Sequence, residues 1–338
     1  MKIKSKWIYN YGKLPAPMVS ASHYTIGDKL YFTLSYGRHP WRGLILELDL
    51  LTQECRTVFE EKHIVGSPDV YEDGRFYFTS FRGVVMCVGV DGSLIWETAI
   101  GKGNPSKAVL MDGDRLYASN NSLFCLDKKT GEIMWTNDYY NKRGSYNISC
   151  NGDYLYSGEQ GGRIYCVNKL TGEKRWDYGE EEWCGYCMTL ESGRLMVTHS
   201  PGKFTFHAPD TGELINTVEA RGRLYRAPIF DSGKMYIGDA NSVMDSTAGN
   251  MTCYEMAGVE MKEMFSVTVG GGISTALLSG DRLFFAAEDS YLYCIDKNTG
   301  EELMTKKKTK GICRDIIVGD GELIALSDKG QVECFTFA

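Results

Sequence analysis

The chain has 338 residues, of which 44 are acidic and 37 are basic, so its formal net charge at neutral pH is -7. This acidic surplus argues against nucleic acid as a partner, because phosphate binding needs a basic surplus on at least one face. No stretch approaches the length of an apolar membrane-spanning helix, so no membrane association is expected.

A tight turn followed by a short apolar strand recurs along the chain, first at Gly27-Asp28 and last at Asp320-Gly321. The apolar anchors of these strands lie 39 to 48 residues apart, and they are Leu30, Phe76, Leu116, Leu155, Leu195, Met235, Leu283 and Leu323. Self-similarity at a period near 40 residues is typical of repeat architectures. Eight anchors therefore predict eight units.

Each unit is predicted to hold four short strands. A cysteine-centred strand follows the anchor strand in six units, with Cys87, Cys125, Cys166, Cys253, Cys294 and Cys334 at the same place. A second turn, Thr-Gly-Glu, comes after this strand in several units, and no segment keeps apolar spacing at the helical period. About 40 residues for four strands match one propeller blade. The predicted fold is therefore all-β, an eight-bladed β-propeller with four antiparallel strands per blade.

The two ends of the sequence complement each other. The last unit stops after its third strand, whereas Lys6-Trp7-Ile8-Tyr9 resembles fourth strands such as Leu94-Ile95-Trp96. The N-terminal strand is therefore expected to complete the last blade and to leave no open sheet edge at the join. No linker divides the chain, so residues 1–338 are predicted to form a single propeller domain.

The sequence also predicts the cellular compartment of the protein. The start, from Met1 to Trp7, has no apolar core and no small-residue cleavage site of the kind that marks a secretory signal. The six repeat cysteines are expected at equivalent depths in different blades, where they cannot meet in pairs. Free buried thiols and a cytoplasmic location are the expectation.

The segments Tyr117–Trp135 and Tyr156–Trp176 contain a sequence motif that resembles the repeat of the pyrroloquinoline-quinone-type eight-bladed propellers. The resemblance covers nearly the whole chain and implies that tryptophans pack between neighbouring blades, here Trp7, Trp96, Trp135 and Trp176. The quinone-dependent dehydrogenases of this superfamily hold their cofactor beneath a disulfide of adjacent cysteines, a pair this chain lacks, so no cofactor is expected. The repeat also looks like that of the propeller subunit of the bacterial outer-membrane assembly machine, a binding scaffold.

The first strand of each blade is expected to line a central channel. Nine residues before each anchor lies a position expected to face this channel, with the next residue on the opposite face. Converging cations and phenols there suit a carboxylate, a phosphate or an acidic peptide side chain. The predicted ligand-binding residues are Lys107, Tyr146, Tyr186, Arg226 and Arg314. The alternative that Asp69, Asp315 or Glu182 neutralises them as structural pairs stays open.

Insertions mark a second candidate surface, because loops held by a rigid scaffold often carry function. Blade one inserts residues 36–43 and blade six inserts residues 240–250, although such insertions also survive by neutrality. The predicted partner-binding residues are Tyr36, Arg38, Trp41, Arg42, Asn241 and Asp245.

No nucleophile, base and orienting group can be assembled, so no catalytic residue is nominated. The five histidines show no ligand spacing, so no metal site is expected. Cys184 and Cys187 have the spacing of a redox motif, but the residues after them read as strand rather than helix, and their role stays open. The leading hypothesis is a cytoplasmic, non-enzymatic scaffold that binds a protein or peptide partner on its variable face, the one that carries the insertions 36–43 and 240–250. The alternative is an enzyme or sensor that binds a small anionic ligand at the channel mouth.

Overall fold

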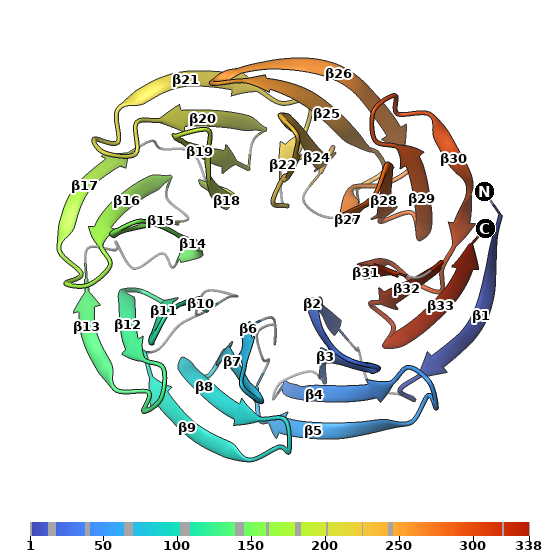
Figure 1. The fold of residues 1–338 in the computed structure, drawn as a ribbon, viewed down its shortest axis with the longest axis horizontal. Coiled ribbons are helices and arrows are strands. Elements are labelled where there is room, and N and C mark those ends of the chain that lie inside the picture. Colours follow the sequence, from blue (N-terminus) through green and yellow to red (C-terminus); the bar gives the residue numbers. More distant parts are fainter. Residues whose placement is uncertain are drawn as a thin grey trace. The chain divides into compact units, whose positions relative to one another are not determined.

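The computed structural model describes residues 2–12, 18–37, 41–63, 70–101, 109–138, 145–159, 162–179, 184–200, 202–224, 226–242, 246–319 and 321–337. These residues form strands and turns without any helix, and eight antiparallel sheets follow one another along the chain (Figure 1). The chain is thus an all-β, eight-bladed β-propeller, as its repeat predicts. In the described ranges nothing helical is long and apolar enough to traverse a lipid bilayer.

The first four blades each contain four strands in sequential order. Blade 1 consists of β2 (Met18–Ile26), β3 (Lys29–Tyr36), β4 (Arg42–Asp49) and β5 (Cys55–Glu61). Blade 2 consists of β6 (Val70–Glu72), β7 (Arg75–Ser80), β8 (Val84–Gly89) and β9 (Leu94–Ala99). Blade 3 consists of β10 (Leu110–Asp112), β11 (Arg115–Ser119), β12 (Leu123–Asp127) and β13 (Ile133–Asn137). Blade 4 consists of β14 (Ser145–Asn151), β15 (Tyr154–Glu159), β16 (Arg163–Asn168) and β17 (Lys174–Gly179).

The remaining blades keep this order, with two variations described below. Blade 5 consists of β18 (Cys184–Glu191), β19 (Arg194–His199), β20 (Lys203–His207) and β21 (Leu214–Glu219). Blade 6 consists of β22 (Arg223–Leu224), β23 (Ile229–Asp231), β24 (Lys234–Ala240), β25 (Gly249–Ala257) and β26 (Glu260–Val269). Blade 7 consists of β27 (Ile273–Ser279), β28 (Arg282–Ala287), β29 (Tyr291–Asp296) and β30 (Glu302–Lys308). Blade 8 consists of β31 (Cys313–Gly319), β32 (Glu322–Ser327), β33 (Gln331–Phe337) and β1 (Ile3–Asn10).

The chain divides into two compact units. One unit contains Ser22–Val197 and His207–Leu214, and the other contains Met1–Ala21, Thr198–Phe206 and Ile215–Ala338. The division passes through blade 5 instead of separating two consecutive segments of sequence, and a single domain over 1–338 stays a prediction.

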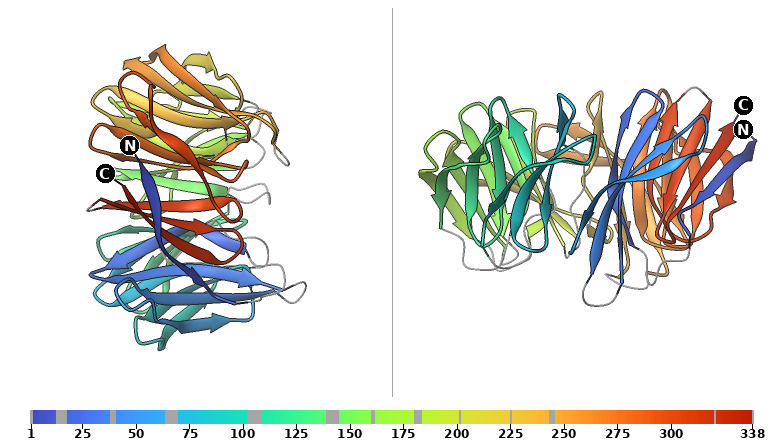
Figure 2. Two further views of the ribbon diagram at one scale, coloured as in Figure 1. Left: turned by 90° about the vertical axis from the view of Figure 1, so that its right-hand side faces the viewer. Right: turned by 90° about the horizontal axis from the view of Figure 1, so that it is seen from below.

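The N-terminal strand completes blade 8, as predicted. Strand β1 pairs antiparallel with β33 from Ile3 opposite Phe337 to Asn10 opposite Gln331, and the sheet order is β1-β33-β32-β31. The two views of Figure 2 show both chain ends side by side at this pair of strands.

The cysteine strands are buried in the six blades that contain them. Cys125 lies between Tyr117 on one neighbouring strand and Trp135 on the other, and all three residues pack with blade 4 residues such as Leu155. The six repeat cysteines are fully buried, and the nine cysteines whose side chains are described are free thiols. The prediction of buried, unpaired thiols is thus confirmed for the six repeat cysteines.

The tryptophans pack across blade boundaries. Trp135 Nε1 donates a hydrogen bond to the Lys169 carbonyl oxygen of blade 4 (3.1 Å), and its ring covers Gly172 in the turn of that blade. Trp96 and Trp176 make the equivalent contacts with the following blades, while Phe265 covers Gly300 without a hydrogen bond from its ring. The packing that the family resemblance implied for Trp96, Trp135 and Trp176 is therefore confirmed.

Candidate functional site

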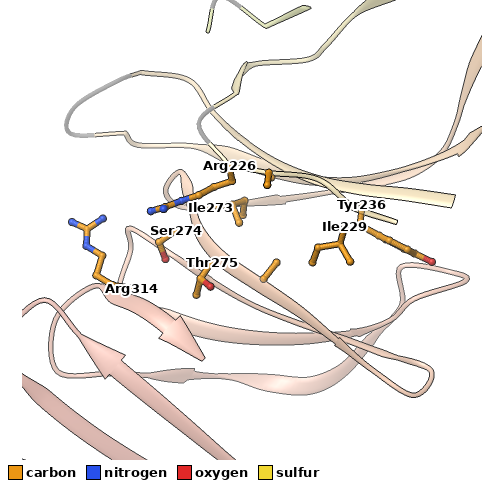
Figure 3. Close-up of a pocket in the computed structure, with 10 residues that line it drawn as sticks. Arg226, Ile229, Tyr236, Ile273, Ser274, Thr275 and Arg314 are labelled. Atoms are coloured by element: carbon orange, nitrogen blue, oxygen red, sulfur yellow. The ribbon is translucent and has the colours of Figure 1, made fainter. Parts of the chain in front are cut away.

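A pocket opens among the first strands of blades 6, 7 and 8 in the second unit. Its volume is about 170 Å³. The lining residues come from β24, β27, β31 and the segment around β23, and they are Arg226, Ala227, Ile229, Tyr236, Gly238, Ile273, Ser274, Thr275, Ala276 and Arg314. Figure 3 shows the guanidinium groups of Arg226 and Arg314 at the same end of this pocket.

The backbone of each contributing first strand is irregular at one equivalent position. In blade 7, Ile273 pairs with Ala287 and Thr275 pairs with Ala286, so Ser274 is an extra residue in a β-bulge. Arg314 occupies the same kind of bulge in blade 8, between Cys313 and Asp315. In blade 6 the first strand is interrupted instead, between Leu224 and Ile229, and Arg226 lies in the interruption. Bulges re-aim side chains and recur beside functional sites.

The backbone of these strands departs from the regular alternation of side chains that the sequence predicted. Strict alternation would place Ala227 and Thr275 on the face opposite Arg226 and Ser274, but all four residues line the pocket. An extra residue in a strand breaks the two-residue alternation, so two consecutive side chains can face the same space.

The arginine end of the pocket is held by hydrogen bonds and a long ion pair. Ser274 Oγ donates to the Cys313 carbonyl oxygen (2.6 Å), which fastens β27 to β31 just before Arg314. Arg314 Nη1 lies 3.9 Å from Glu288 Oε1, and both side chains are about 30% exposed. An ion pair at this distance and exposure contributes little net stability and leaves the guanidinium able to bind another anion. Glu288, which is outside the pocket lining, thus approaches Arg314, and Asp315 Oδ1 accepts a hydrogen bond from the Ile316 amide.

The opposite end of the pocket is apolar. The ring of Tyr236 is almost fully buried beside Ile229 there, whereas Ile273, which is 7% exposed, lies beside Arg226 in Figure 3. In Figure 3 the Tyr236 hydroxyl points away from the two arginines, so this residue presents its ring to the pocket. Gly238 lets β24 approach β27 closely, because a Cβ atom there would collide with the Ile273 side chain. No feature of the sequence pointed to these apolar residues, because their convergence depends on the close approach of two blades.

The predicted ligand-binding residues have three outcomes. Arg226 and Arg314 are brought together at the pocket. Tyr146 and Tyr186 lie on β14 and β18, and the register places Tyr146 in a bulge like that of Arg314, but their side chains are outside the described part of the structure. Lys107 lies outside the described residues altogether, as do Asp69 and Glu182.

The predicted partner-binding residues lie at the β3–β4 and β24–β25 connections. Arg42 forms an exposed ion pair with Glu60, and Trp41 and Tyr36 are half-buried. Asn241 organises its own loop, because its Oδ1 accepts hydrogen bonds from Ser246 Oγ (2.7 Å) and the Thr247 amide (3.2 Å). Arg38 and Asp245 are outside the described residues.

The cysteine pair of the CxxC sequence lies on strand β18, which runs from Cys184 to Glu191. The strand predicted for the residues after this pair is confirmed, and it also includes the pair itself, although the two thiols are outside the described side chains. Among the described residues, no group of three or more His, Cys, Asp and Glu side chains is arranged to hold a metal ion.

A family model described as "Outer membrane protein assembly factor BamB" matches residues 37–182 and 247–337, more than half of the chain. BamB of Shewanella oneidensis is 28% identical over 185 residues, which cover 49% of this chain and 45% of that protein. A quinoprotein ethanol dehydrogenase of Pseudomonas putida is 30% identical over 152 residues, which cover 35% of this chain and 24% of the enzyme. The matches therefore span less than half the length of these curated relatives.

Solved structures show the same fold at low sequence identity. BamB from Moraxella catarrhalis superposes with a TM-score of 0.67 at 15% identity, covering 99% of this chain and 98% of that one. Sqt1 from Saccharomyces cerevisiae superposes with a TM-score of 0.75 at 12% identity, over the full length of both chains.

Proposed function

The chain belongs to the family of outer membrane protein assembly factor BamB, and from this premise we propose that it is a non-enzymatic propeller scaffold that binds a protein or peptide partner. One observation links the proposed function to a particular site. The pocket of blades 6 to 8 is lined by two guanidiniums and by aliphatic groups, a set suited to holding an anionic group of a partner. It presents no nucleophile paired with a general base among its lining residues.

The quinoprotein relatives raise the question of a quinone cofactor, and the described residues do not fit one. A pocket of about 170 Å³ is close to the size that holds one benzene-sized group, whereas pyrroloquinoline quinone has three fused rings. The lining contains no carboxylate to ligate the calcium ion that would accompany it.

Capture of partners in the source cell tests the proposal. Protein carrying Arg226→Gln and Arg314→Gln should recover its partners after cross-linking in much lower yield than the unaltered protein, at unchanged Tm. Arg221→Gln is a matched control, because Arg221 lies in the same unit and pairs with Glu263 at 2.6 Å on an outer strand. Replacing Trp41 and Arg42, or the 240–250 loop, tests the variable loops in the same assay. Unchanged capture by all of these variants would refute the proposal.

The pocket also supports a second candidate, a sensor or enzyme for a small anionic molecule, because the same two arginines lie over a small pocket. A thermal-shift screen of acidic metabolites distinguishes the two functions. A rise in Tm that disappears in Arg226→Ala or Arg314→Ala, together with unaltered partner capture, would favour the small ligand.

A reducing compartment, the cytoplasm, is part of the proposal. The nine described cysteines are free thiols, and seven of them are fully buried, as is typical of proteins that never meet an oxidising environment. Cell fractionation followed by thiol labelling of denatured protein tests this location. Recovery outside the cytoplasm, or a disulfide in the protein as isolated, would count against it.

A further inference from the structure

We infer that the pocket of blades 6 to 8 binds a carboxylate that carries a short apolar group, as found at the C-terminal residue of a peptide. The inference rests on the proposed partner-binding function and names the chemical group that the pocket accepts. The charge at one end of the pocket, the apolar surface beyond it and the space between them together specify this group.

The charged end presents cations from two different blades. Arg226 comes from the interrupted first strand of blade 6, and Arg314 comes from the bulge of blade 8. Both side chains are half-buried, and Figure 3 shows their guanidinium groups on the same side, with the Ser274 and Thr275 hydroxyls nearby. Because a guanidinium presents its donors in a planar fork, a pair of them matches the two oxygens of one carboxylate.

The bulged backbone is what makes this convergence possible. Ser274 uses its hydroxyl to bind the Cys313 carbonyl oxygen, so it fixes the backbone from which Arg314 departs. Ser274 is 2% exposed and is therefore a positioning residue. A preorganised charged site of this kind loses little entropy when its ligand arrives.

The apolar end limits which carboxylates fit. Ile229 and the ring of Tyr236 line the space beyond the arginines, and Ile273 lies beside Arg226, so a bound anion places its substituent against hydrocarbon. Sulfate or phosphate would leave this surface without a partner. An internal Asp or Glu side chain would bring a carboxylate but no apolar group beyond it.

The volume sets the size of that substituent. A pocket of about 170 Å³ holds one group of about the size of benzene and is smaller than the pockets that bind drug-sized ligands. A carboxylate with one branched aliphatic side chain satisfies both ends within this space. The C-terminal residue of a peptide has this chemistry, and so does a free branched short-chain acid.

Fluorescence polarisation with defined probes tests the inference on the whole chain. The first probe is a fluorescein-labelled peptide, Gly-Ser-Gly-Ser-Ile, with a free C-terminal carboxylate. The second is the same peptide amidated at its C-terminus, and the third ends in glycine. Amidation is expected to weaken binding about tenfold or more, because it removes a charged acceptor, and the glycine ending should weaken it several-fold.

Variants locate the binding and separate it from folding. Arg226→Gln and Arg314→Gln should each weaken binding of the first probe about tenfold, and Arg221→Gln should leave it unchanged. Gly238→Ala is an independent variant, because its added Cβ would collide with the apolar Ile273 side chain and both arginines are kept. This variant should reduce the preference for isoleucine over glycine, and circular dichroism verifies that each variant folds.

Competition with free 4-methylpentanoate distinguishes the two sources of this chemistry. Displacement of the probe at similar concentrations of acid and peptide indicates a small carboxylic acid, and displacement only at far higher acid concentrations indicates a peptide terminus. Both results support the carboxylate site. Equal binding of the free and amidated peptides, or no binding of any probe, would overturn it. Partner capture that survives in the arginine variants would instead contradict the proposed role of the pocket while leaving carboxylate binding intact.

Discussion

At the residue scale, the repeat cysteines act as small apolar side chains. Their thiols stay protonated because they are buried. Burial raises the pKa of the Cys87 thiol from 9.0 to about 11 and that of the Cys166 thiol to about 12. The same cause raises the pKa of Cys294 to about 11 and that of Cys334 to about 12. These thiols are therefore neutral and unreactive in the folded protein at physiological pH.

These raised pKa values predict that alkaline pH destabilises the fold. Between about pH 9 and 12 the folded state retains protons that the unfolded state has lost, so the free energy of unfolding must fall as pH rises. Each tenfold difference in how tightly a thiol holds its proton in the folded and unfolded states removes about 1.4 kcal/mol of stability at most, and stability below pH 8 is unaffected by these groups. Urea unfolding at pH 7.5, 9.0 and 10.5 measures the effect, and Cys87→Ala should reduce it. An unfolding midpoint that stays constant up to pH 10.5 would contradict this explanation.

The glycine beneath each tryptophan is a second residue-scale feature. Gly172 has a φ of +74°, and a Cβ atom there would lie 2.6 Å from the Trp135 ring. Gly193 has nearly the same φ, +72°, but nothing lies within 4 Å of its Cβ position. We expect Gly193→Ala to cost about 1 kcal/mol from backbone strain, and Gly172→Ala to cost about 1 to 3 kcal/mol more from the collision. Equal losses in urea unfolding would show that the tryptophan does not restrict this position.

At the element scale, a lysine that follows the cysteine strand reaches back to an acid on the first strand of the preceding blade. Lys169 Nζ lies 2.6 Å from Asp112 Oδ2, and Lys297 Nζ lies 2.9 Å from Asp231 Oδ2. Lys128 pairs with Glu72 in the same way and also donates to the Gly113 carbonyl oxygen (2.7 Å). These contacts fix the relative position of consecutive blades within each unit.

The Lys128–Glu72 pair predicts an asymmetry between its two partners. The Lys128 side chain is 9% exposed and that of Glu72 is 40% exposed, so losing the acid leaves a buried charge, while losing the lysine leaves a hydrated one. We expect Glu72→Gln to cost about 1 to 3 kcal/mol and Lys128→Met to cost less. The double variant should be more stable than Glu72→Gln alone. A larger loss from Lys128→Met, measured by urea unfolding, would show that packing of the lysine stem dominates.

The blades could be predicted from the sequence because their signal is local and repeated. The turn at Gly113-Asp114, the strand centred on Cys125 and the turn at Gly131 each recur in other blades. The lysine contacts could not be predicted, because they join residues of two blades whose register is set only by packing.

The site was predictable only in part for the same reason. Counting back from the anchors placed Arg226 and Arg314 at equivalent positions, and the structure brings both to one pocket. The bulge at Ser274 has no mark in the sequence, because it follows from how that first strand meets its neighbours. The interruption before Ile229 coincides with Pro228, which cannot donate a backbone hydrogen bond to a ladder, and this signal was missed.

At the scale of the whole molecule, the pairing of β1 with β33 joins residues more than 300 positions apart. Ile3 packs against the core shared by blades 7 and 8, and Trp7 lies opposite Cys334. Ser5 Oγ donates to Glu333 Oε1 (3.1 Å), and burial raises the pKa of this glutamate. Without β1, blade 8 would expose the edge of β33 and lose the hydrogen bond that supports a buried carboxyl group.

Deleting residues 1–10 should therefore lower the Tm by more than about 5 °C and promote aggregation, because an unpaired apolar strand edge can pair with other chains. A synthetic peptide of residues 2–12 should restore the Tm of the truncated protein in a concentration-dependent way, since it binds only the folded state. The same peptide with Ile3→Asn should fail, whereas Ile8→Asn should succeed, because Ile8 is 37% exposed and Ile3 packs against the core. Thermal unfolding with light scattering measures both effects. A truncated protein with unchanged Tm and solubility would show that blade 8 does not depend on the N-terminal strand.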